Sequence, residues 1–433
     1  MTRTMSVSRL ARAVVALSLT SVAALAGCSG SGSGDDPNTL RIAWEAGNKA
    51  AMEAVVARFK AQNPDVNVQV DYFSGQNMFT TLRTQFSAGT APDIVVSWPG
   101  GGTPLGIKVL SKDGFLADLS EEPWVKDVPK ALLPNMEDDQ GRVVSFMGVI
   151  TGFAPIYNNE AMMAAGLQVP TKWSEVIPFC KAARQAGKVA YAQGIVEPNL
   201  TYFPAYASYA ELVYGQDRAF DEDMARGKAM FADSGWKTVL QRNVDMTDAG
   251  CFNDDYAGVD NVEVQKRWAR GDALATFTHG QEILYALPFN PKATFTLAAY
   301  PADDNPDNDW QTIFQHFGLA VNAKGNVEMA KSFVRFFATP EVNTLYINSA
   351  TDGPEKGAMP VFKDPNTWKP SQFSEEWTKY IENGRFVSMP ENIWPNPEIR
   401  QALIEGMQDA LAHRKSVDDV LAAMQVAYGK GGS

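Results

Sequence analysis

Apolar and polar positions alternate between strand and helix spacing through the first hundred residues. An apolar run at 40–44 is typical of a short buried strand, and residues 52–59 repeat apolar side chains at i, i+3, i+4 and i+7, the spacing of one helix face. Residues 66–72 alternate with period two, 78–88 return to a helical pattern, and 93–98 form a third apolar strand. This order predicts an α/β fold with a parallel or mixed sheet covered by helices.

Helical patterns become more frequent from residue 173 onward. The expected elements are a helix from near Ser174, an aromatic-rich segment at 201–214, a helix at 262–270, strands at 273–278 and 318–322, and a helix at 330–337. A long apolar face follows at 399–411. Ser416 and Asp419 then have the spacing of a capping box, which predicts one last helix.

The N-terminus has the pattern of a bacterial secretory leader. Three arginines precede an apolar stretch at 13–26, which ends in Leu25-Ala26-Gly27-Cys28. This tetrapeptide matches the lipobox of bacterial lipoproteins, so we expect residues 1–27 to be cleaved and Cys28 to carry diacylglycerol. Ser and Gly fill positions 29–34, and we interpret 28–36 as a flexible tether. The protein would then lie outside the cytoplasm, anchored to the outer face of the cell membrane; the alternative is a buried cysteine in an ordinary apolar segment.

Composition and charge narrow the classes of partner. The 433 residues are 45% hydrophobic, enough for two or three domain-sized cores, and the net charge is −12. No block of five basic residues occurs, so the surface should repel phosphate backbones and we expect no nucleic-acid partner. No apolar run of eighteen residues follows Cys28, so the sequence predicts no further membrane span.

Three cysteines are present, and lipidation of Cys28 would leave Cys180 and Cys251. In an oxidising compartment a disulfide between them is expected, whereas the alternative is two separate buried thiols. The three histidines, His279, His316 and His413, are not at metal-ligand spacing, and we expect no metal site there.

Motifs for catalysis or nucleotide binding are absent. Gly100-Gly101-Gly102 lacks the Lys and Ser/Thr of a phosphate-binding loop, so it is either a tight turn beside a ligand or an ordinary surface turn. The acidic stretch 303–309 departs from a calcium loop at Pro306 and has Phe314 where the closing Glu should be. We therefore expect no catalytic residue, no cofactor and no metal.

Aromatic and acidic side chains gather where the predicted strands end. Glu45 follows the first strand, Phe73 the second, and Trp98 closes the third. Ligands of α/β sheets bind beyond these carboxyl ends, and aromatic faces beside carboxylates and amides suit sugar rings. Taken singly, each aromatic residue is more often part of a core.

Motifs along nearly the whole chain after the leader resemble the extracellular solute-binding proteins of ABC importers, the family that includes maltose-binding protein. The similar segments are 40–44, 59–70, 91–95, 114–119, 156–159 and 166–175. The resemblance implies a two-lobed, periplasmic-binding-protein-like α/β fold with hinge crossovers between the lobes. One lobe would hold 37–150 and 318–349, and the other 151–317 and 350–433.

Together with the strand ends, the resemblance implies a ligand site between the lobes. The candidate contacts are Glu45, Asn48, Phe73, Gln76, Trp98, Thr151, Glu197, Tyr202, Glu282, Gly353 and Trp394. After His279-Gly280, where relatives have a tryptophan, this chain has Gln281, so the resemblance does not extend to that stacking residue.

The resemblance implies a receptor that catalyses nothing. We expect a monomer that captures a sugar, most simply an oligosaccharide, by hinge closure and delivers it to a membrane permease. A polyol, a polyamine or an organic anion is the alternative ligand; Glu45, Asp71, Glu197 and Glu282 would suit a cation. A secreted glycoside hydrolase, with two of these carboxylates as its catalytic pair, is the remote alternative.

Overall fold

The computed structural model describes residues 38–430 apart from 75–76, 281 and 351–357. Within these residues one mixed sheet of ten strands runs in the order β2-β1-β3-β8-β4-β6-β5, with β10 on β8 and with β7 and β9 on β4. The strands are β1 (Thr39–Glu45), β2 (Asn67–Phe73), β3 (Ile94–Ser97), β4 (Ser145–Asn158), β5 (Val189–Ala192), β6 (Ala273–His279), β7 (Phe295–Leu297), β8 (Gln311–Val321), β9 (Met359–Pro360) and β10 (Phe386–Ser388).

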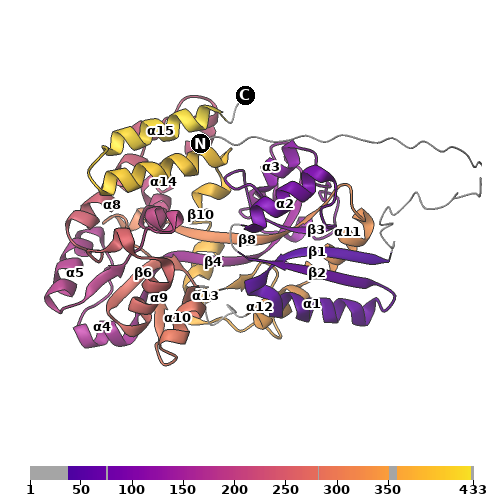
Figure 1. Cartoon of the computed structure of the whole chain (residues 1–433), viewed down its shortest axis with the longest axis horizontal. Coiled ribbons are helices and arrows are strands. Elements are labelled where there is room, and N and C mark those ends of the chain that lie inside the picture. Colours follow the sequence, from indigo (N-terminus) through magenta and orange to yellow (C-terminus); the bar gives the residue numbers. More distant parts are fainter. Residues whose placement is uncertain (1–37, 75–76, 281, 351–357, 431–433) are drawn as a thin grey trace, which may run out of the picture. The chain divides into compact units, whose positions relative to one another are not determined.

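Helices pack around the sheet (Figure 1), and several short 3-10 turns lie in the connections between elements. They are α1 (Lys49–Gln62), α2 (Asn77–Ala88), α3 (Ile107–Lys112), α4 (Asn159–Ala165), α5 (Trp173–Gln185), α6 (Phe203–Tyr209), α7 (Phe220–Ala225), α8 (Trp236–Asp248), α9 (Asn261–Arg270), α10 (Glu282–Ala286), α11 (Val327–Phe337), α12 (Pro340–Ser349), α13 (Gln372–Glu382), α14 (Pro397–Leu411) and α15 (Val417–Lys430). A π-helical turn, Ala210–Tyr214, extends α6.

The early alternation of strands and helices is confirmed. β1 pairs in parallel with β2 and with β3, and α1 and α2 form the connections between these strands. β3 pairs antiparallel with β8, which comes more than 200 residues later, so the sheet is mixed. The predicted helix at 52–59 lies inside α1, whose buried positions include Met52, Val55 and Phe59. α1 ends at Gln62, before Pro64.

Two long antiparallel strands, β4 and β8, connect the two ends of the sheet (Figure 1). Every residue of β4 is buried. The sequence predicted only 318–322 of β8, because the polar side chains that precede this segment hide its first half. Those side chains are buried and hydrogen-bonded: Thr312 Oγ1 donates to the Tyr206 carbonyl at 2.7 Å, and Gln315 Nε2 donates to the Met147 carbonyl at 3.1 Å.

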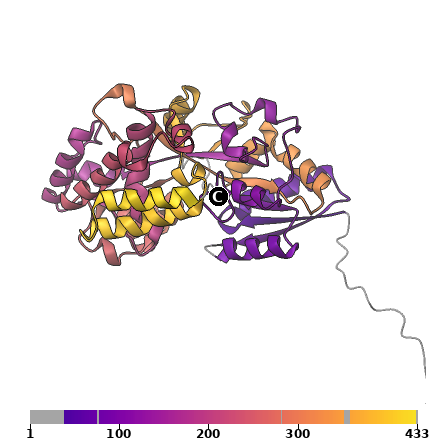
Figure 2. The same cartoon turned by 90° about the horizontal axis from the view of Figure 1, so that it is seen from above.

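Apolar side chains form two clusters. The first collects side chains of β1, β3, α1, α2, α11 and α12, and we call it the first core. The second collects side chains of α5, α6, α8, α14 and α15, and we call it the second core. α14 and α15 lie side by side in both views (Figure 1 and Figure 2), and their apolar side chains belong to the second core. The predicted capping box starts α15, since Ser416 N donates to Asp419 Oδ2 at 2.9 Å and Asp419 N donates to Ser416 Oγ at 3.2 Å.

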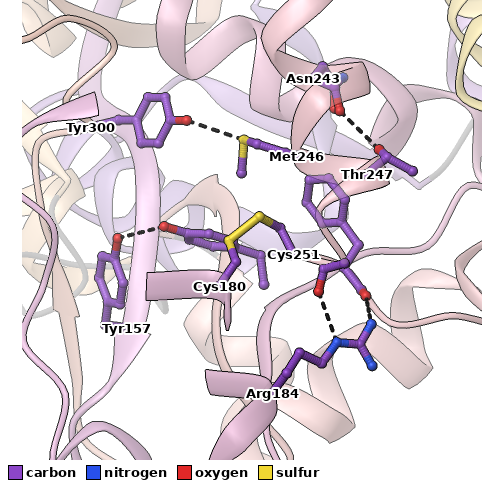
Figure 3. The surroundings of a disulfide bond; sticks show 11 residues. Tyr157, Cys180, Arg184, Asn243, Met246, Thr247, Cys251 and Tyr300 are labelled. Carbon is purple, nitrogen blue, oxygen red and sulfur yellow. Dashed lines mark hydrogen bonds between the residues drawn. A yellow bond between two sulfur atoms is a disulfide. The ribbon is translucent and has the colours of Figure 1, made fainter. Parts of the chain in front are cut away.

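The predicted disulfide is confirmed. Cys180 on α5 is bonded to Cys251, which follows α8, and both cysteines are buried in the second core (Figure 3). Arg184, one turn further along α5, supports the same junction: its Nε donates to the Gly250 carbonyl at 2.9 Å, and its Nη2 donates to the Phe252 carbonyl. Arg184 Nη2 also pairs with Asp254 Oδ1 at 2.6 Å, so the segment that follows α8 is fastened to α5 by the disulfide and by the hydrogen bonds of Arg184.

The π-helical turn places a carboxylate inside the protein. Glu211 is 4% exposed, and its Oε2 accepts a hydrogen bond from the Ala302 amide at 2.8 Å. Burial raises the pKa of Glu211 to about 8; the charges of Asp303 and Asp309 raise it further, whereas Arg242 and the Ala302 hydrogen bond oppose the shift. At neutral pH this carboxyl group is therefore mostly protonated.

This pKa predicts a pH-dependent stability. The folded protein holds a proton on Glu211 between about pH 4.5 and pH 8 that the unfolded chain releases, so the free energy of unfolding should fall as pH rises through this window. The Glu211 contribution has a slope of up to about 1.4 kcal/mol per pH unit. Urea denaturation of the parent and of Glu211→Gln from pH 5 to pH 9 measures it. An identical pH dependence in both proteins would contradict the assignment.

Candidate functional site

A network of carboxylates and amides lies where α9 and α10 begin. Asp260 caps α9 by accepting from the Glu263 amide at 2.8 Å, which places Asn261 at the first helical position. The Asn261 amide donates to Glu197 Oε2 at 2.9 Å, and Asn261 Nδ2 donates to Glu282 Oε2 at 3.1 Å. Gln265 Nε2 reaches the same Glu282 oxygen at 2.6 Å. Two predicted contacts, Glu197 and Glu282, are thus held by residues that the sequence did not predict.

The loop after β1 lies against α10. Asn48 is buried, and its Nδ2 is 3.4 Å from Glu45 Oε2. A Cβ atom placed on Gly47 would lie 2.8 Å from Glu45 Oε2 and 3.1 Å from the hydroxyl oxygen of Tyr285. Glu45 and Asn48, both predicted, therefore lie close to Tyr285, which was not predicted. Tyr285 lies in the short helix α10, and its sequence has no motif that marks this tyrosine as a ligand contact.

The ends of the long strands add an aromatic pair. His279 closes β6, and its ring centroid is 5.0 Å from that of Phe314 on β8. Burial lowers the pKa of His279 and the charge of Glu282 opposes this shift only partly, so the imidazole is neutral at pH 7. Thr151 lies opposite Phe314 in the β4–β8 register and is buried. The predicted contact Thr151 therefore lies on β4, beside the pair formed by His279 and Phe314.

A small cavity of about 10 Å³ lies behind Glu282, and Asn261 and Gln265 also line it. Two further lining groups, Trp268 Nε1 and Thr278 Oγ1, are buried and have no hydrogen-bond partner in the described part of the chain. This volume is close to that of one water-sized probe. The space behind Glu282 is thus lined by polar groups and is too small for more than about one water molecule.

Three predicted aromatic contacts are packed in the cores. Trp98 is 9% exposed, belongs to the first core, and its ring centroid is 5.0 Å from that of Phe79. Tyr202 belongs to the second core, where burial raises its pKa and its hydroxyl accepts from Arg400 Nε at 2.9 Å. Trp394 is also buried there, against several aromatic rings. None of the three forms an open stacking face in this structure.

The other candidates have simpler positions. Phe73 is half-buried at the end of β2. Gln76, Gly353 and the lipidation candidate Cys28 lie outside the described residues.

The three consecutive glycines make a backbone-to-backbone contact instead of an ordinary surface turn. The amide of Gly101 donates to the Trp394 carbonyl at 3.1 Å, and that of Gly102 donates to the Glu391 carbonyl at 3.0 Å. Gly100 has φ +66°, and a Cβ atom there would lie 2.1 Å from the Asn392 carbonyl oxygen. This approach requires glycine because any side chain would displace the opposing backbone.

We predict that Gly100→Ala destabilises the protein by about 2 kcal/mol more than Gly114→Ala does. Gly114 also has a positive φ, +70°, but a Cβ atom there would meet nothing within 4 Å, so this control carries only the conformational cost of about 1 kcal/mol. Urea denaturation of both variants measures the difference. Equal free energies of unfolding would mean that the contact with residues 391–395 contributes nothing.

Within the described ranges, no group of three His, Cys, Asp or Glu side chains is arranged to hold a metal ion. No helix built from those residues is both long and apolar enough to cross a bilayer.

Comparisons with known proteins identify relatives of the whole fold. The family described as "Bacterial extracellular solute-binding protein" matches residues 43–344. A structure described as "SBP RafE in complex with raffinose" superposes with a TM-score of 0.72 at 17% identity, covering 91% of this chain and 100% of that chain. A "Chitin oligosaccharide binding protein" superposes with a TM-score of 0.74 at 17% identity, covering 91% and 98%. The fold is therefore the two-lobed α/β fold of these binding proteins.

A curated relative matches a shorter region. An "Uncharacterized lipoprotein in oleD 5'region" of Streptomyces antibioticus is 27% identical over 185 residues. This match covers 40% of the present chain and 40% of the relative.

Proposed function

Because the chain belongs to the bacterial extracellular solute-binding protein family, we propose that it is the lipid-anchored receptor of an ABC importer. In this proposal the protein captures a sugar, most simply an oligosaccharide, between its two lobes and delivers it to a membrane permease. The relatives named for raffinose and for chitin oligosaccharide support the sugar class. The curated relative, itself named a lipoprotein, supports the anchor at Cys28.

One observation carries the sugar proposal: the network that joins Glu197, Asn261 and Glu282. Its hydrogen bonds hold two carboxylates in fixed positions while leaving acceptor capacity on each. Sugar hydroxyls donate to such oxygens, and a preformed network reduces the entropy lost on binding. Glu45 approaches from the loop after β1, near Tyr285, so a ligand held by both groups would favour the closed arrangement of the lobes.

A small cation is the second candidate ligand for this site. Glu45, Glu197 and Glu282 are all half-buried, and a cation would compensate the three charges that a neutral sugar leaves in place. The sugar and cation proposals therefore differ in how a carboxylate-to-amide substitution acts. An amide still bonds hydroxyls, but it removes the charge that a cation needs.

Thermal denaturation of the purified protein against a panel of sugars and polyamines tests the proposal. A ligand at a hundred times its dissociation constant should stabilise the protein by about 2.7 kcal/mol. If the ligand is a sugar, Glu197→Gln and Glu282→Gln should each weaken its binding by no more than about tenfold, because the amide oxygen still accepts from hydroxyls. If the ligand is a cation, each substitution should abolish binding, whereas the control Glu263→Gln should leave the binding of either ligand unchanged. Glu263 lies on the same helix but pairs with Lys266 and Arg267. A polyamine hit without a sugar hit would favour the second candidate, and cleavage of a bound oligosaccharide would contradict a purely binding role.

The anchor has its own test. Cys28→Ala should release the protein from the membrane fraction or leave its leader uncleaved, because the lipobox cysteine is the acceptor of the lipid. A variant that is correctly cleaved and stays with the membrane would contradict lipidation at Cys28.

A further inference from the structure

A second cavity of about 450 Å³ shares no lining residue with the candidate ligand site. Its walls come from the segment before α5, the segment after β7, the π-helical turn and α13. Five carboxylates and one lysine line it: Glu211, Asp303, Asp304, Asp309, Glu376 and Lys172. This volume lies within the range of small-molecule sites.

Glu211 is the buried carboxylate among the residues that line this cavity. Only one of its oxygens has a partner: Oε2 accepts from the Ala302 amide, while Oε1 has no hydrogen bond to any residue that the structure describes. The neighbouring Asp309, by contrast, accepts from Tyr380 at one oxygen and from Gln311 at the other, both at 3.0 Å. Because Glu211 lines the cavity, a ligand bound there can supply the donor for Oε1 that the protein does not provide.

The surroundings suit a cation with an apolar body. Arg242 is close to the acidic groups but is stacked on Trp173, 4.3 Å from its ring centroid, and together with Lys172 it leaves carboxylates in excess. Tyr300 and Tyr380 add aromatic rings to the wall. The Tyr300 hydroxyl is already directed at the Met246 sulfur, 3.3 Å away (Figure 3).

We propose that this cavity binds a small organic cation whose amino or guanidino group donates a hydrogen bond to Glu211 Oε1. The apolar part of the ligand lies against Ala298, Ala299 and the tyrosine rings. A divalent metal ion fits less well, because the described carboxylates surround the space without forming a group of three that could coordinate one. The proposal does not depend on the ligand of the candidate site.

Binding is coupled to proton release. The pKa of Glu211 is raised to about 8 chiefly by burial; Asp303 and Asp309 add to the shift and Arg242 opposes it, while Lys172, Asp304, Glu376 and Tyr380 also face the cavity. A bound cation favours the carboxylate, so at pH 7 the protein should release close to one proton for each ligand bound. The affinity should rise roughly five- to tenfold from pH 7 to pH 8.5, where Glu211 is mostly ionised before the ligand arrives.

Calorimetric titration of the purified protein with 1,4-diaminobutane tests this inference. The titration is done at pH 7 in two buffers of different ionisation enthalpy. The difference between the two binding enthalpies, divided by the difference in ionisation enthalpy, should correspond to the release of nearly one proton for each diamine bound. The isosteric neutral compound 1,4-butanediol should not bind. Absence of diamine binding, equal binding of the diol, or binding without proton release would each overturn the proposal.

Substitutions locate the site. Glu211→Gln should weaken diamine binding at least tenfold and abolish proton release, and Asp309→Asn should also weaken it, whereas the exposed control Glu53→Gln should not. Parent-like diamine binding in both cavity variants would overturn the proposal. Loss of diamine binding in Glu197→Gln would also overturn it, since the diamine would then occupy the candidate site. Glu211→Gln should keep the affinity for any sugar that the thermal panel identifies, which separates this test from that of the proposed function.

Discussion

Replacing both disulfide cysteines with alanine is expected to lower the free energy of unfolding by about 4 kcal/mol. The bond between Cys180 and Cys251 closes a long loop, since the two residues are 71 positions apart, and in the chain-entropy model a loop of this size restricts the unfolded chain by about that amount. Urea denaturation of the oxidised parent and of the double alanine variant measures the loss.

Reduction of the parent provides the matched control, because it opens the same loop without changing any side chain. The reduced parent and the alanine variant should have similar stability, and the remaining contacts of Arg184 should still hold α5 to the segment after α8. A double variant within about 1 kcal/mol of the oxidised parent would show that the loop is already restricted in the unfolded state.

Trp98→Ala is expected to cost about 3–5 kcal/mol, the range for removing a buried large aromatic side chain. The residue is almost fully buried beside Phe79, and it precedes the glycine loop, so the cavity would open next to the contact with residues 391–395. Thermal and urea denaturation measure the loss of stability.

Trp98→Phe is the graded control and should cost clearly less, because it keeps a ring in the same space. The ligand-contact interpretation of Trp98 predicts a different pattern: lower affinity for the sugar with little change in stability. If Trp98→Ala keeps the parent stability and loses ligand affinity, Trp98 is a ligand contact and its role in packing the first core is wrong.

Periodicity predicted the elements whose buried side is apolar. β1, α1, β2, α2 and β3 appear where the pattern placed them, because their buried or, in β2, half-buried positions carry apolar side chains at the spacing of their own backbone. The first half of β8 was not predicted, because its buried side chains include polar ones. Thr312 and Gln315 are polar yet buried, and only the three-dimensional structure supplies the carbonyl groups to which they donate.

The site was predicted less completely than the fold. The resemblance pointed to Glu197 and Glu282, but Asn261 and Gln265, which hold them, occupy ordinary polar positions on an amphipathic helix. The resemblance also pointed to Trp394, which this structure packs inside the second core; the sequence alone does not distinguish a tryptophan that lines a ligand site from one inside a core. The disulfide could be predicted from the sequence alone. The chain has three cysteines, and assigning Cys28 to the lipid leaves one possible pair, Cys180 and Cys251.

The composition of the first core has a consequence for the export that the N-terminal leader predicts. That core joins Leu40, near the start of the described chain, to Trp377 and Phe386, near its end. A chain that emerges from a translocation channel with its N-terminus first cannot complete this core until almost all of it has crossed. The apolar side chains of the early strands should therefore remain exposed to solvent on the far side of the membrane until most of the chain has crossed. Such a chain depends on chaperones there or on rapid late folding.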